Sequence, residues 1–284
     1  MNEEMVMENN GFTEIDIEEY KELKKLEKDK VFDMLDHSTF NLHKGAHLRE
    51  YLEVQGKFPH YSVANAILIC EQMPNAQWIK TFDEWKNKGA YIKKGAKAIK
   101  ILEPTEYTRP DGSKGTGSNV KKVFDVSQTD LAERYEEIPM IRAAVAGMLY
   151  KNPSEIVPVK EDSGIEAAHF DKDENKLYVR MDRKSEEIFH DLSLECAYQE
   201  LTIGNDEDKE SVKNKAECVA YMIAAGSGAE RPHIDLFHIG CQVEGWDPID
   251  IRKEMSVVRN AYTSIVSRMD RYRDAAKEQN MQER

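Results

Sequence analysis

Long hydrophobic runs are absent from this sequence. A membrane-spanning helix needs about 20 predominantly apolar residues, and no stretch here approaches that length. The first residues, MNEEMVMENN, are acidic and lack the basic start and apolar core of a signal peptide. We therefore expect a cytoplasmic protein that does not engage a membrane.

Cysteines are few and widely spaced. The four, Cys70, Cys196, Cys218 and Cys241, form no C-x-x-C pair, which indicates reduced thiols and argues against a disulfide framework or a cysteine-bound zinc. The sequence also has no G-x-G-x-x-G, P-loop or G-x-S-x-G motif. Nucleotide-binding and serine-hydrolase functions therefore have no support.

Positive charge is in deficit. The chain has 40 Lys and Arg against 53 Asp and Glu, which gives a net charge of −13. Most of such a surface repels phosphate, so any nucleic-acid site must be a local patch. Hydrophobic residues make up 40% of the chain, which is enough for a core. At roughly 100 to 200 residues per domain, the length of 284 residues favours two domains.

The pattern of apolar residues, turns and charges predicts an α+β fold. We expect four segments, which are an acidic mobile tail (1–14), an α+β domain (15–130), a helical junction (131–155) and a mainly helical domain with a small β-hairpin (156–284). The predicted strands of the first domain are 98–102 and 122–126, joined by a long flexible tip over 109–118.

Local signals also predict several helices. One covers 15–35, and another starts after the N-cap Ser62 and stops before Pro74. Thr81 and Glu84 have the spacing of a capping box, which predicts a short helix that carries Trp85. In the second half, a hairpin at 167–170 and 177–180 precedes helices at 185–201, at 211–225 and from Pro248 onward.

Basic residues concentrate between Ala76 and Lys122. Eleven lysines and arginines face five acids there, a balance of +6, so the remainder of the chain carries −19. Four aromatic residues are interleaved with them, namely Trp78, Trp85, Tyr91 and Tyr107. Single-stranded nucleic acid is bound by this combination, because cations follow the phosphates while rings stack on bases. A solvated lysine face above buried aromatic residues has the same composition, and composition alone leaves both interpretations open.

Several blocks of this region resemble the N-terminal domain of ArdC-type antirestriction proteins. The blocks are 61–69 (YSVANAILI), 73–76 (MPNA), 82–86 (FDEWK), 89–99 (GAYIKKGAKAI) and 123–129 (VFDVSQT). The resemblance implies a single-stranded DNA-binding domain attached to a zinc-metallopeptidase-like domain, in a protein carried by plasmids and conjugative elements. Carried over block by block, it implies DNA contacts from Asn65, Trp78, Trp85, Lys86, Tyr91, Lys93, Lys94 and Lys97. Trp85 is equally suited to anchor its short helix.

The second half resembles the peptidase-like part of the same family, most closely its LtrC-like branch in Gram-positive mobile elements. The matching blocks are 177–180, 188–201 and 216–222. A zinc peptidase of this class needs H-E-x-x-H on one helix, whereas residues 194–198 are LECAY. Glu195 keeps the position of the base and Glu217 that of a third ligand, but Leu194 and Tyr198 replace both histidines. The resemblance therefore implies a degenerate, zincin-like domain without metal or cofactor, in which Glu195 and Glu217 are vestigial or simply helix-surface residues.

Three functional hypotheses follow. The first is a non-enzymatic accessory protein of a mobile element that binds single-stranded DNA. The second is an inhibitor whose acidic surface binds a basic surface on a protein of the restriction, defence or conjugation machinery. The third is an active zinc peptidase with non-standard ligands around His190, such as Glu186 or Glu187.

Overall fold

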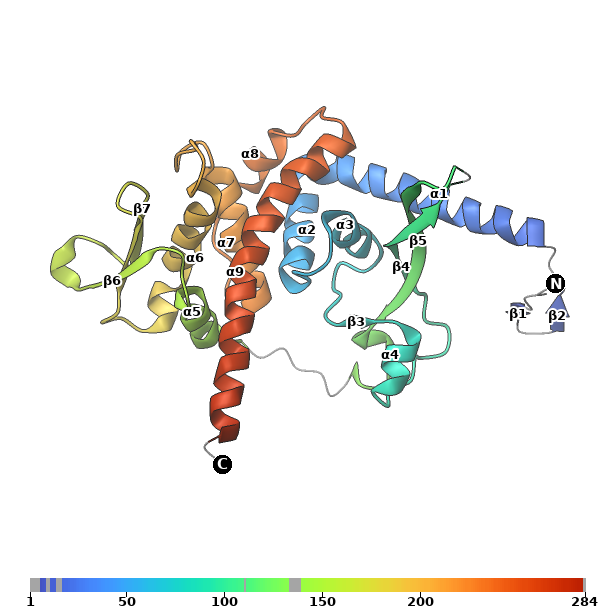
Figure 1. Cartoon of the computed structure of the whole chain (residues 1–284), viewed down its shortest axis with the longest axis horizontal. Coiled ribbons are helices and arrows are strands. Elements are labelled where there is room, and N and C mark those ends of the chain that lie inside the picture. Colours follow the sequence, from blue (N-terminus) through green and yellow to red (C-terminus); the bar gives the residue numbers. More distant parts are fainter. Residues whose placement is uncertain (1–5, 9–10, 14–16, 110, 133–138, 283–284) are drawn as a thin grey trace.

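The computed structural model describes residues 6–8, 11–13, 17–109, 111–132 and 139–282. It has the predicted α+β fold. The long C-terminal helix α9 (Pro248–Gln282) runs through the middle of the molecule (Figure 1). Elements of the first half lie on one side of α9, and most elements of the second half lie on the other.

The first half contains four helices, a three-stranded sheet and a short N-terminal ribbon. Its elements are β1 (Val6–Glu8), β2 (Gly11–Thr13), α1 (Ile17–Phe40), α2 (Gly45–Lys57), α3 (Val63–Gln72), β3 (Ile79–Lys80), α4 (Phe82–Asn87), β4 (Ile99–Thr108) and β5 (Lys114–Asp125). The strands β1 and β2 pair antiparallel, so the segment predicted as a mobile tail contains regular structure in its described residues.

Two helix starts follow from local side-chain hydrogen bonds, as predicted. The Ser62 hydroxyl accepts the Asn65 N–H at 3.2 Å and caps α3. Thr81 and Glu84 form the capping box of α4, in which the Glu84 carboxylate accepts the Thr81 N–H at 2.8 Å. Helix α2 was not predicted from the sequence. A Cβ at Gly45 would lie 3.0 Å from the backbone nitrogen of Phe237, so close packing against α8 (Leu236–Cys241) requires glycine there.

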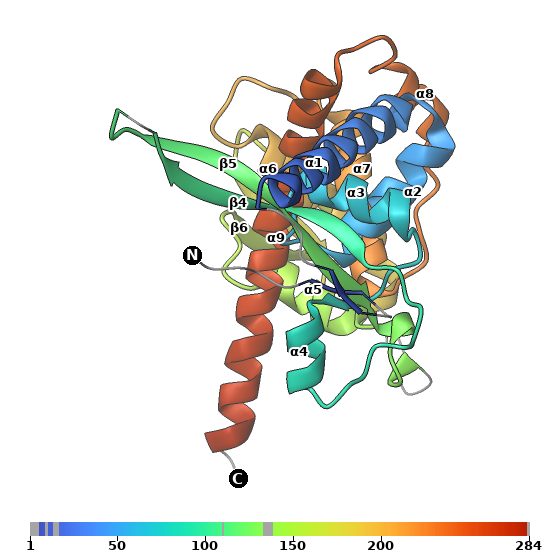
Figure 2. The same ribbon diagram turned by 90° about the vertical axis from the view of Figure 1, so that its right-hand side faces the viewer.

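The β4–β5 hairpin is longer than predicted. Its antiparallel pairing continues from Ile99 opposite Val123 to Thr108 opposite Lys114, so the second half of the expected flexible tip, residues 114–118, is strand. Figure 2 shows this twisted ribbon projecting from the molecule. Strand β3 pairs with the other edge of β5 and completes the sheet.

The second half combines a small mixed sheet with helices. Its elements, besides α8 and α9, are α5 (Ile141–Leu149), β6 (Glu155–Val159), β7 (Ala168–Asp171), β8 (Lys176–Arg180), α6 (Ser185–Thr202) and α7 (Lys213–Ser227). The predicted β7–β8 hairpin and the helices α6, α7 and α9 are present. Strand β6, which was not predicted, pairs with β8 in parallel.

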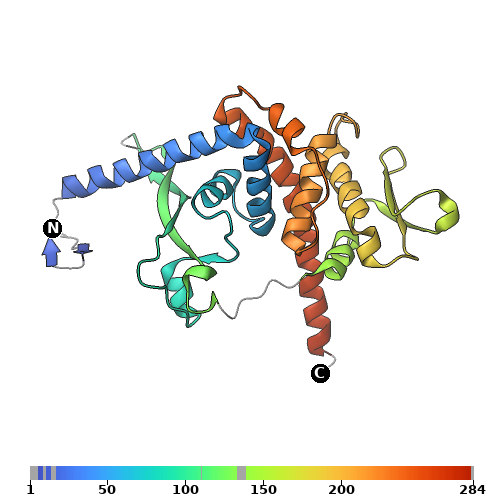
Figure 3. The same ribbon diagram turned by 180° about the vertical axis from the view of Figure 1, so that it is seen from behind.

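One hydrophobic core joins the two halves. It includes Leu52 of α2, Leu68 of α3, Met222 of α7 and Ile265 of α9. Figure 3 shows α2 between α3 and the helices of the second half, and α2 packs directly against α7. No helix in the described part of the chain is long and apolar enough to span a membrane.

Candidate nucleic-acid interface

The basic aromatic region has a small core of its own. Trp85 is fully buried and packs with Ala90 and Val126. Its indole N–H donates to the Phe124 carbonyl at 2.8 Å, and its ring meets that of Trp78 edge to face, with ring centroids 5.0 Å apart. This cluster anchors α4 and the segment after it to the end of β5.

Two of the residues predicted to contact DNA are structural. Trp85 has no exposed surface, so its ring cannot stack on a base. Asn65 is 9% exposed, and its amide pairs with the backbone of Leu102 on β4, where Nδ2 donates to the carbonyl and Oδ1 accepts the N–H, both at 2.8 Å. Asn65 therefore joins α3 to the sheet, and both residues are removed from the proposed interface.

The loop from Lys88 to Ala98 is fixed by hydrogen bonds to residues 127–130. The N–H of Tyr91 donates to the Asp130 carboxylate at 2.9 Å, and the N–H of Asp130 donates to the Tyr91 carbonyl at 3.1 Å. The N–H of Lys93 donates to the Gln128 carbonyl at 2.8 Å, while Gln128 Nε2 donates to the Lys97 carbonyl at 2.7 Å. The loop thus presents its side chains from a fixed backbone.

Six lysines lie on α4, on this loop and just before them. They are Lys80, Lys86, Lys88, Lys93, Lys94 and Lys97, and all but the half-buried Lys80 are exposed. None of the six makes an ion pair with a carboxylate in the described ranges. The ammonium groups of Lys80 and Lys88 lie 5.6 and 5.1 Å from the centre of the Trp78 ring. We call these six residues the lysine cluster.

The lysines of the hairpin have a different environment. Lys100 and Lys122 both face Glu27 of α1, at 2.8 and 3.9 Å. Lys121 pairs with Glu103 at 2.6 Å, and Lys114 lies 3.7 Å from Glu106. The four hairpin lysines therefore each lie beside a glutamate, while Arg109 of the hairpin lies 5.9 Å from the centre of the Tyr107 ring, and the lysine cluster has no ion pair in the described ranges.

Exposed rings accompany the lysine cluster. Tyr91 is 70% exposed and lies next to Lys93 and Lys94 in the sequence, and Phe82 of α4 is 55% exposed. Trp78 is half-buried, since one side of its ring packs on Trp85. Phe82, Lys80 and Lys88 were not among the predicted contact residues. Lys80 and Lys88 could have been identified from the basic window between Ala76 and Lys122, which includes both, whereas no local signal marks Phe82 as exposed.

Glu195 of α6, to which the sequence resemblance assigns the position of a catalytic base, forms an ion pair. Glu195 Oε2 lies 2.6 Å from the ammonium nitrogen of Lys209 and accepts the N–H of Phe170 at 2.6 Å. The same ammonium group lies 5.2 Å from the centre of the Tyr198 ring. The Glu195 carboxylate thus pairs with the cation of Lys209 and accepts a backbone hydrogen bond from the edge strand β7.

The side chains present do not suit a catalytic metal. Burial first, and then the negative charges of Glu195 and Glu217, raise the pKa of Tyr198, so this phenol stays protonated and is a poor ligand. Glu217 lines a polar pocket of about 520 Å³ together with His233 and His238. Across the described residues, no three His, Cys, Asp or Glu side chains are grouped so that they could hold a metal ion. His190 is exposed, and its ring packs edge to face on Phe189.

Comparison with known families identifies the first half. Residues 29–146 match the family model of the N-terminal domain of anti-restriction factor ArdC. The chain carries an ArdC-type N-terminal domain. This confirms the predicted family, and the match includes the lysine cluster and the hairpin. The LtrC-like branch stays a prediction.

One solved structure agrees with the ArdC-type fold. The metal-free crystal structure of the antirestriction protein ArdC from the R388 plasmid is 15% identical, with a TM-score of 0.50, and the match covers 87% of this chain and 98% of that one. The Mn(II)-bound structure of the same protein is 14% identical, with a TM-score of 0.46, over 78% and 98% of the two chains. A comparison with curated proteins gave no match.

Proposed function

We propose that this ArdC-type protein binds single-stranded DNA as an antirestriction or accessory protein of a plasmid or conjugative element, and that it acts in the cytoplasm. The lysine cluster around the exposed Tyr91 is the observation that carries the proposal. Between Trp78 and Ala98 six lysines face two acids, Asp83 and Glu84, in a chain whose net charge is −13. The carboxylate of Glu84 is already engaged in the capping box.

The arrangement suits unpaired strands better than duplex. An exposed ring on a fixed loop can stack on a base only where the base is unpaired, and each such contact contributes about 1 to 3 kcal/mol. Flexible lysines bind phosphates as point charges and need no base sequence. The negative charge elsewhere on the chain is screened over about 8 Å at physiological ionic strength, which leaves the cluster able to attract phosphate.

Fluorescence anisotropy with a labelled oligonucleotide across a salt series tests this function. The Lys93→Glu/Lys94→Glu variant should bind much more weakly and show a shallower dependence of affinity on salt. Each lost phosphate contact should reduce the slope of log K against log salt by about 0.7. The matched control is Lys21→Glu/Lys25→Glu, which changes the net charge equally on the exposed face of α1.

Two outcomes of the anisotropy experiment would reject the lysine cluster as a DNA site. If wild-type protein shows no binding at low salt, or if both double variants weaken binding equally, the lysine cluster is not a DNA site. A duplex and an RNA of the same sequence are the competing ligands. Preference for either would retain nucleic-acid binding and reject single-stranded DNA as the target.

We further propose that the second half is a catalytically inactive peptidase-like scaffold. The ion pair between Glu195 and Lys209 supports this, because it engages the only carboxylate in the position of a catalytic base. Glu195→Gln should leave DNA binding unchanged, and purified protein should show no zinc-dependent cleavage of a protein substrate. Stoichiometric zinc in protein purified without chelator would contradict the proposal.

The competing function is inhibition of a restriction or defence enzyme through the acidic surface. The charge of −19 outside the basic window supports it. Pull-down from cell extract after nuclease treatment separates the two functions. A stable protein partner that remains after nucleic acid is removed, together with absent oligonucleotide binding, would favour inhibition.

A further inference from the structure

A cavity of about 160 Å³ lies where the two halves of the chain meet. Its walls come from the end of α2 and from α5, α7 and α9. The apolar part of the wall is formed by Ala143, Ala144, Ile223, Val266 and Met269. An apolar cavity of about 150 Å³ is large enough to hold a benzene molecule, so a single small ring would fit here.

One buried polar group at the cavity has no protein partner. Ser227 is 2% exposed, and its hydroxyl makes no hydrogen bond to any described residue. Its carbonyl, in contrast, accepts the Met140 N–H at 2.9 Å. A buried hydroxyl without a hydrogen bond is unfavourable. The Ser227 hydroxyl lines the cavity and can bond an oxygen atom placed inside it.

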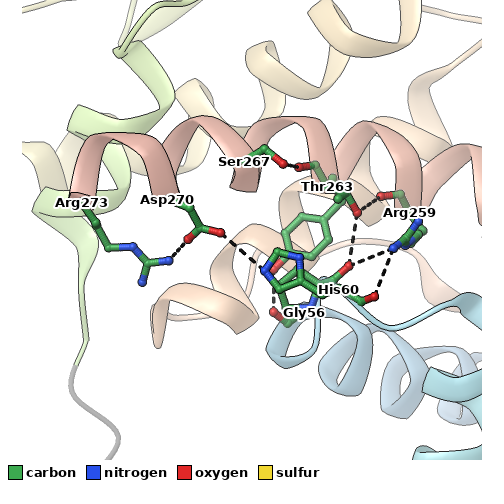
Figure 4. Close-up of polar contacts among 9 residues, drawn as sticks. Gly56, His60, Arg259, Thr263, Ser267, Asp270 and Arg273 are labelled. Atoms are coloured by element: carbon green, nitrogen blue, oxygen red, sulfur yellow. Dashed lines mark hydrogen bonds and ion pairs between the residues drawn. The ribbon is translucent and has the colours of Figure 1, made fainter. Parts of the chain in front are cut away.

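The lining of the cavity also includes cationic side chains. Lys57 and Arg273 both contribute to it. Arg273 is paired with Asp270, whose other carboxylate oxygen lies 3.5 Å from His60 Nε2 (Figure 4). Lys57 has no ion pair within the described ranges. No carboxylate lines the cavity, and although the charge of Lys57 acts on the nearby Glu53, that carboxylate is paired with Arg231, so the lining favours an anionic group.

The walls are fixed before any ligand binds. Tyr262 donates its hydroxyl proton to the Gly56 carbonyl at 2.5 Å, which ties α9 to the end of α2. The Thr263 hydroxyl donates to the Arg259 carbonyl within α9 at 2.8 Å (Figure 4). A Cβ at Gly226 would lie 2.5 Å from the Gly56 carbonyl oxygen, so glycine permits the close contact of α7 with the end of α2. Preformed cavities with few polar groups are typical of small-molecule sites.

We propose that this cavity binds a small aromatic carboxylate. The ring lies among the apolar side chains, a carboxylate oxygen accepts the Ser227 hydroxyl proton, and Lys57 and Arg273 balance the negative charge. Because the walls come from both halves, the bound molecule strengthens the contact between them and raises the melting temperature of the whole chain.

Isothermal titration of the full-length protein with benzoate tests the site. We expect one benzoate per chain, and Ala144→Leu, which fills the cavity, should weaken binding at least tenfold. Ala146→Leu on the same helix is the matched control, since Ala146 does not line the cavity, and it should bind as wild type does. Ser227→Ala removes only the hydroxyl and should weaken binding several-fold while the melting temperature without ligand is retained.

Benzyl alcohol has a ring of the same size without the charge. Binding of benzyl alcohol as tight as that of benzoate would overturn the assignment of an anionic ligand. No saturable binding of benzoate, or equal binding by wild type, Ala144→Leu and Ser227→Ala, would overturn the site itself. The oligonucleotide titration does not depend on either result.

Discussion

Lys209 places its ammonium nitrogen 2.6 Å from Oε2 of Glu195, the residue to which the sequence resemblance assigns the position of a catalytic base. The Glu195 side chain is only 14% exposed, so its charge needs a partner. Lys209 comes from the segment between α6 and α7 and provides that partner. Lys209 thus provides the positive charge beside the Glu195 carboxylate.

Replacing Lys209 should reveal this dependence. Lys209→Met leaves the Glu195 carboxylate with the Phe170 N–H but without a cation, and should lower the free energy of unfolding by about 1 to 3 kcal/mol. Glu195→Gln can still accept that N–H, so the double variant should be more stable than Lys209→Met alone. Urea denaturation of the four proteins in the cycle measures the coupling between the two residues.

A surface ion pair provides the comparison. Lys253 and Asp250 on α9 lie 2.8 Å apart, with both side chains more than half exposed. Lys253→Met should change stability by less than about 0.5 kcal/mol, because exposed pairs contribute little. Equal effects of Lys209→Met and Lys253→Met would show that the Glu195 pair has no special role.

Asn65 should behave as a structural residue. Asn65→Leu removes two hydrogen bonds to buried backbone groups of Leu102, and should cost about 2 to 6 kcal/mol, at about 1 to 3 kcal/mol for each buried group left unsatisfied. The folded fraction should bind an oligonucleotide with unchanged affinity at low temperature. Asn119→Leu on the exposed surface of β5 is the control for stability. If a fully folded Asn65→Leu protein bound the oligonucleotide more weakly, Asn65 would have to contact the DNA.

Asn65 and Trp85 also show where sequence analysis stops. The N-cap Ser62 and the capping box of Thr81 use partners three residues away, so the helix starts could be predicted. Burial of Asn65 and Trp85 depends on Leu102 and Phe124, which are 37 and 39 residues distant. A short window of sequence contains no information on hydrogen bonds between residues so far apart. Exposed and buried aromatic residues among lysines also look the same in the sequence.

The same limit applies to ion pairs and to parallel strands. Glu27 neutralises Lys100 and Lys122 from a separate helix, so the division of the basic window could not be predicted from charge counts. Strand β6 pairs in parallel with β8, its neighbour in the sheet, although β7 lies between the two in the sequence. The short helix α4 could be predicted from its capping box, whereas the loop after it is fixed by hydrogen bonds to residues 127–130, more than 30 residues away in the sequence.

Glu53 should make the stability of the chain sensitive to acid. Burial opposes its ionisation, but hydrogen bonds and charge from Arg231, a hydrogen bond from Tyr221 and the charge of Lys57 outweigh this and hold the pKa of Glu53 below its ordinary value. A carboxyl whose pKa is lower in the folded chain stabilises it above the unfolded pKa of about 4.3, and this contribution disappears as the pH falls through the folded value.

Wild-type protein should therefore lose more stability than Glu53→Gln between about pH 6 and pH 3, because the unfolded carboxyl titrates near 4.3. Melting temperatures across this range provide the measurement. Glu50→Gln on the same helix is the control, since Glu50 is exposed and has no ion pair in the described ranges. Parallel curves for wild type and Glu53→Gln would show that the contact of Glu53 with Arg231 and Tyr221 adds no stability at neutral pH.

Alanine variants of two exposed tyrosines, Tyr91 and Tyr107, distinguish stacking on a base from a nonspecific effect of removing a surface ring. Tyr91, which is 70% exposed, is on the loop that carries Lys93 and Lys94, whereas Tyr107, which is 51% exposed, lies on the hairpin beside Gly115. If Tyr91 stacks on an unpaired base, Tyr91→Ala should weaken oligonucleotide binding by about 1 to 3 kcal/mol with little change in the salt slope, since no phosphate contact is lost. Tyr107→Ala should leave affinity near the wild-type value, because Lys114 and Lys121 of the hairpin are already paired with glutamates and Tyr107 has only Arg109 against its ring among the described cations. The opposite order of effects would move the DNA site from the lysine cluster to the hairpin.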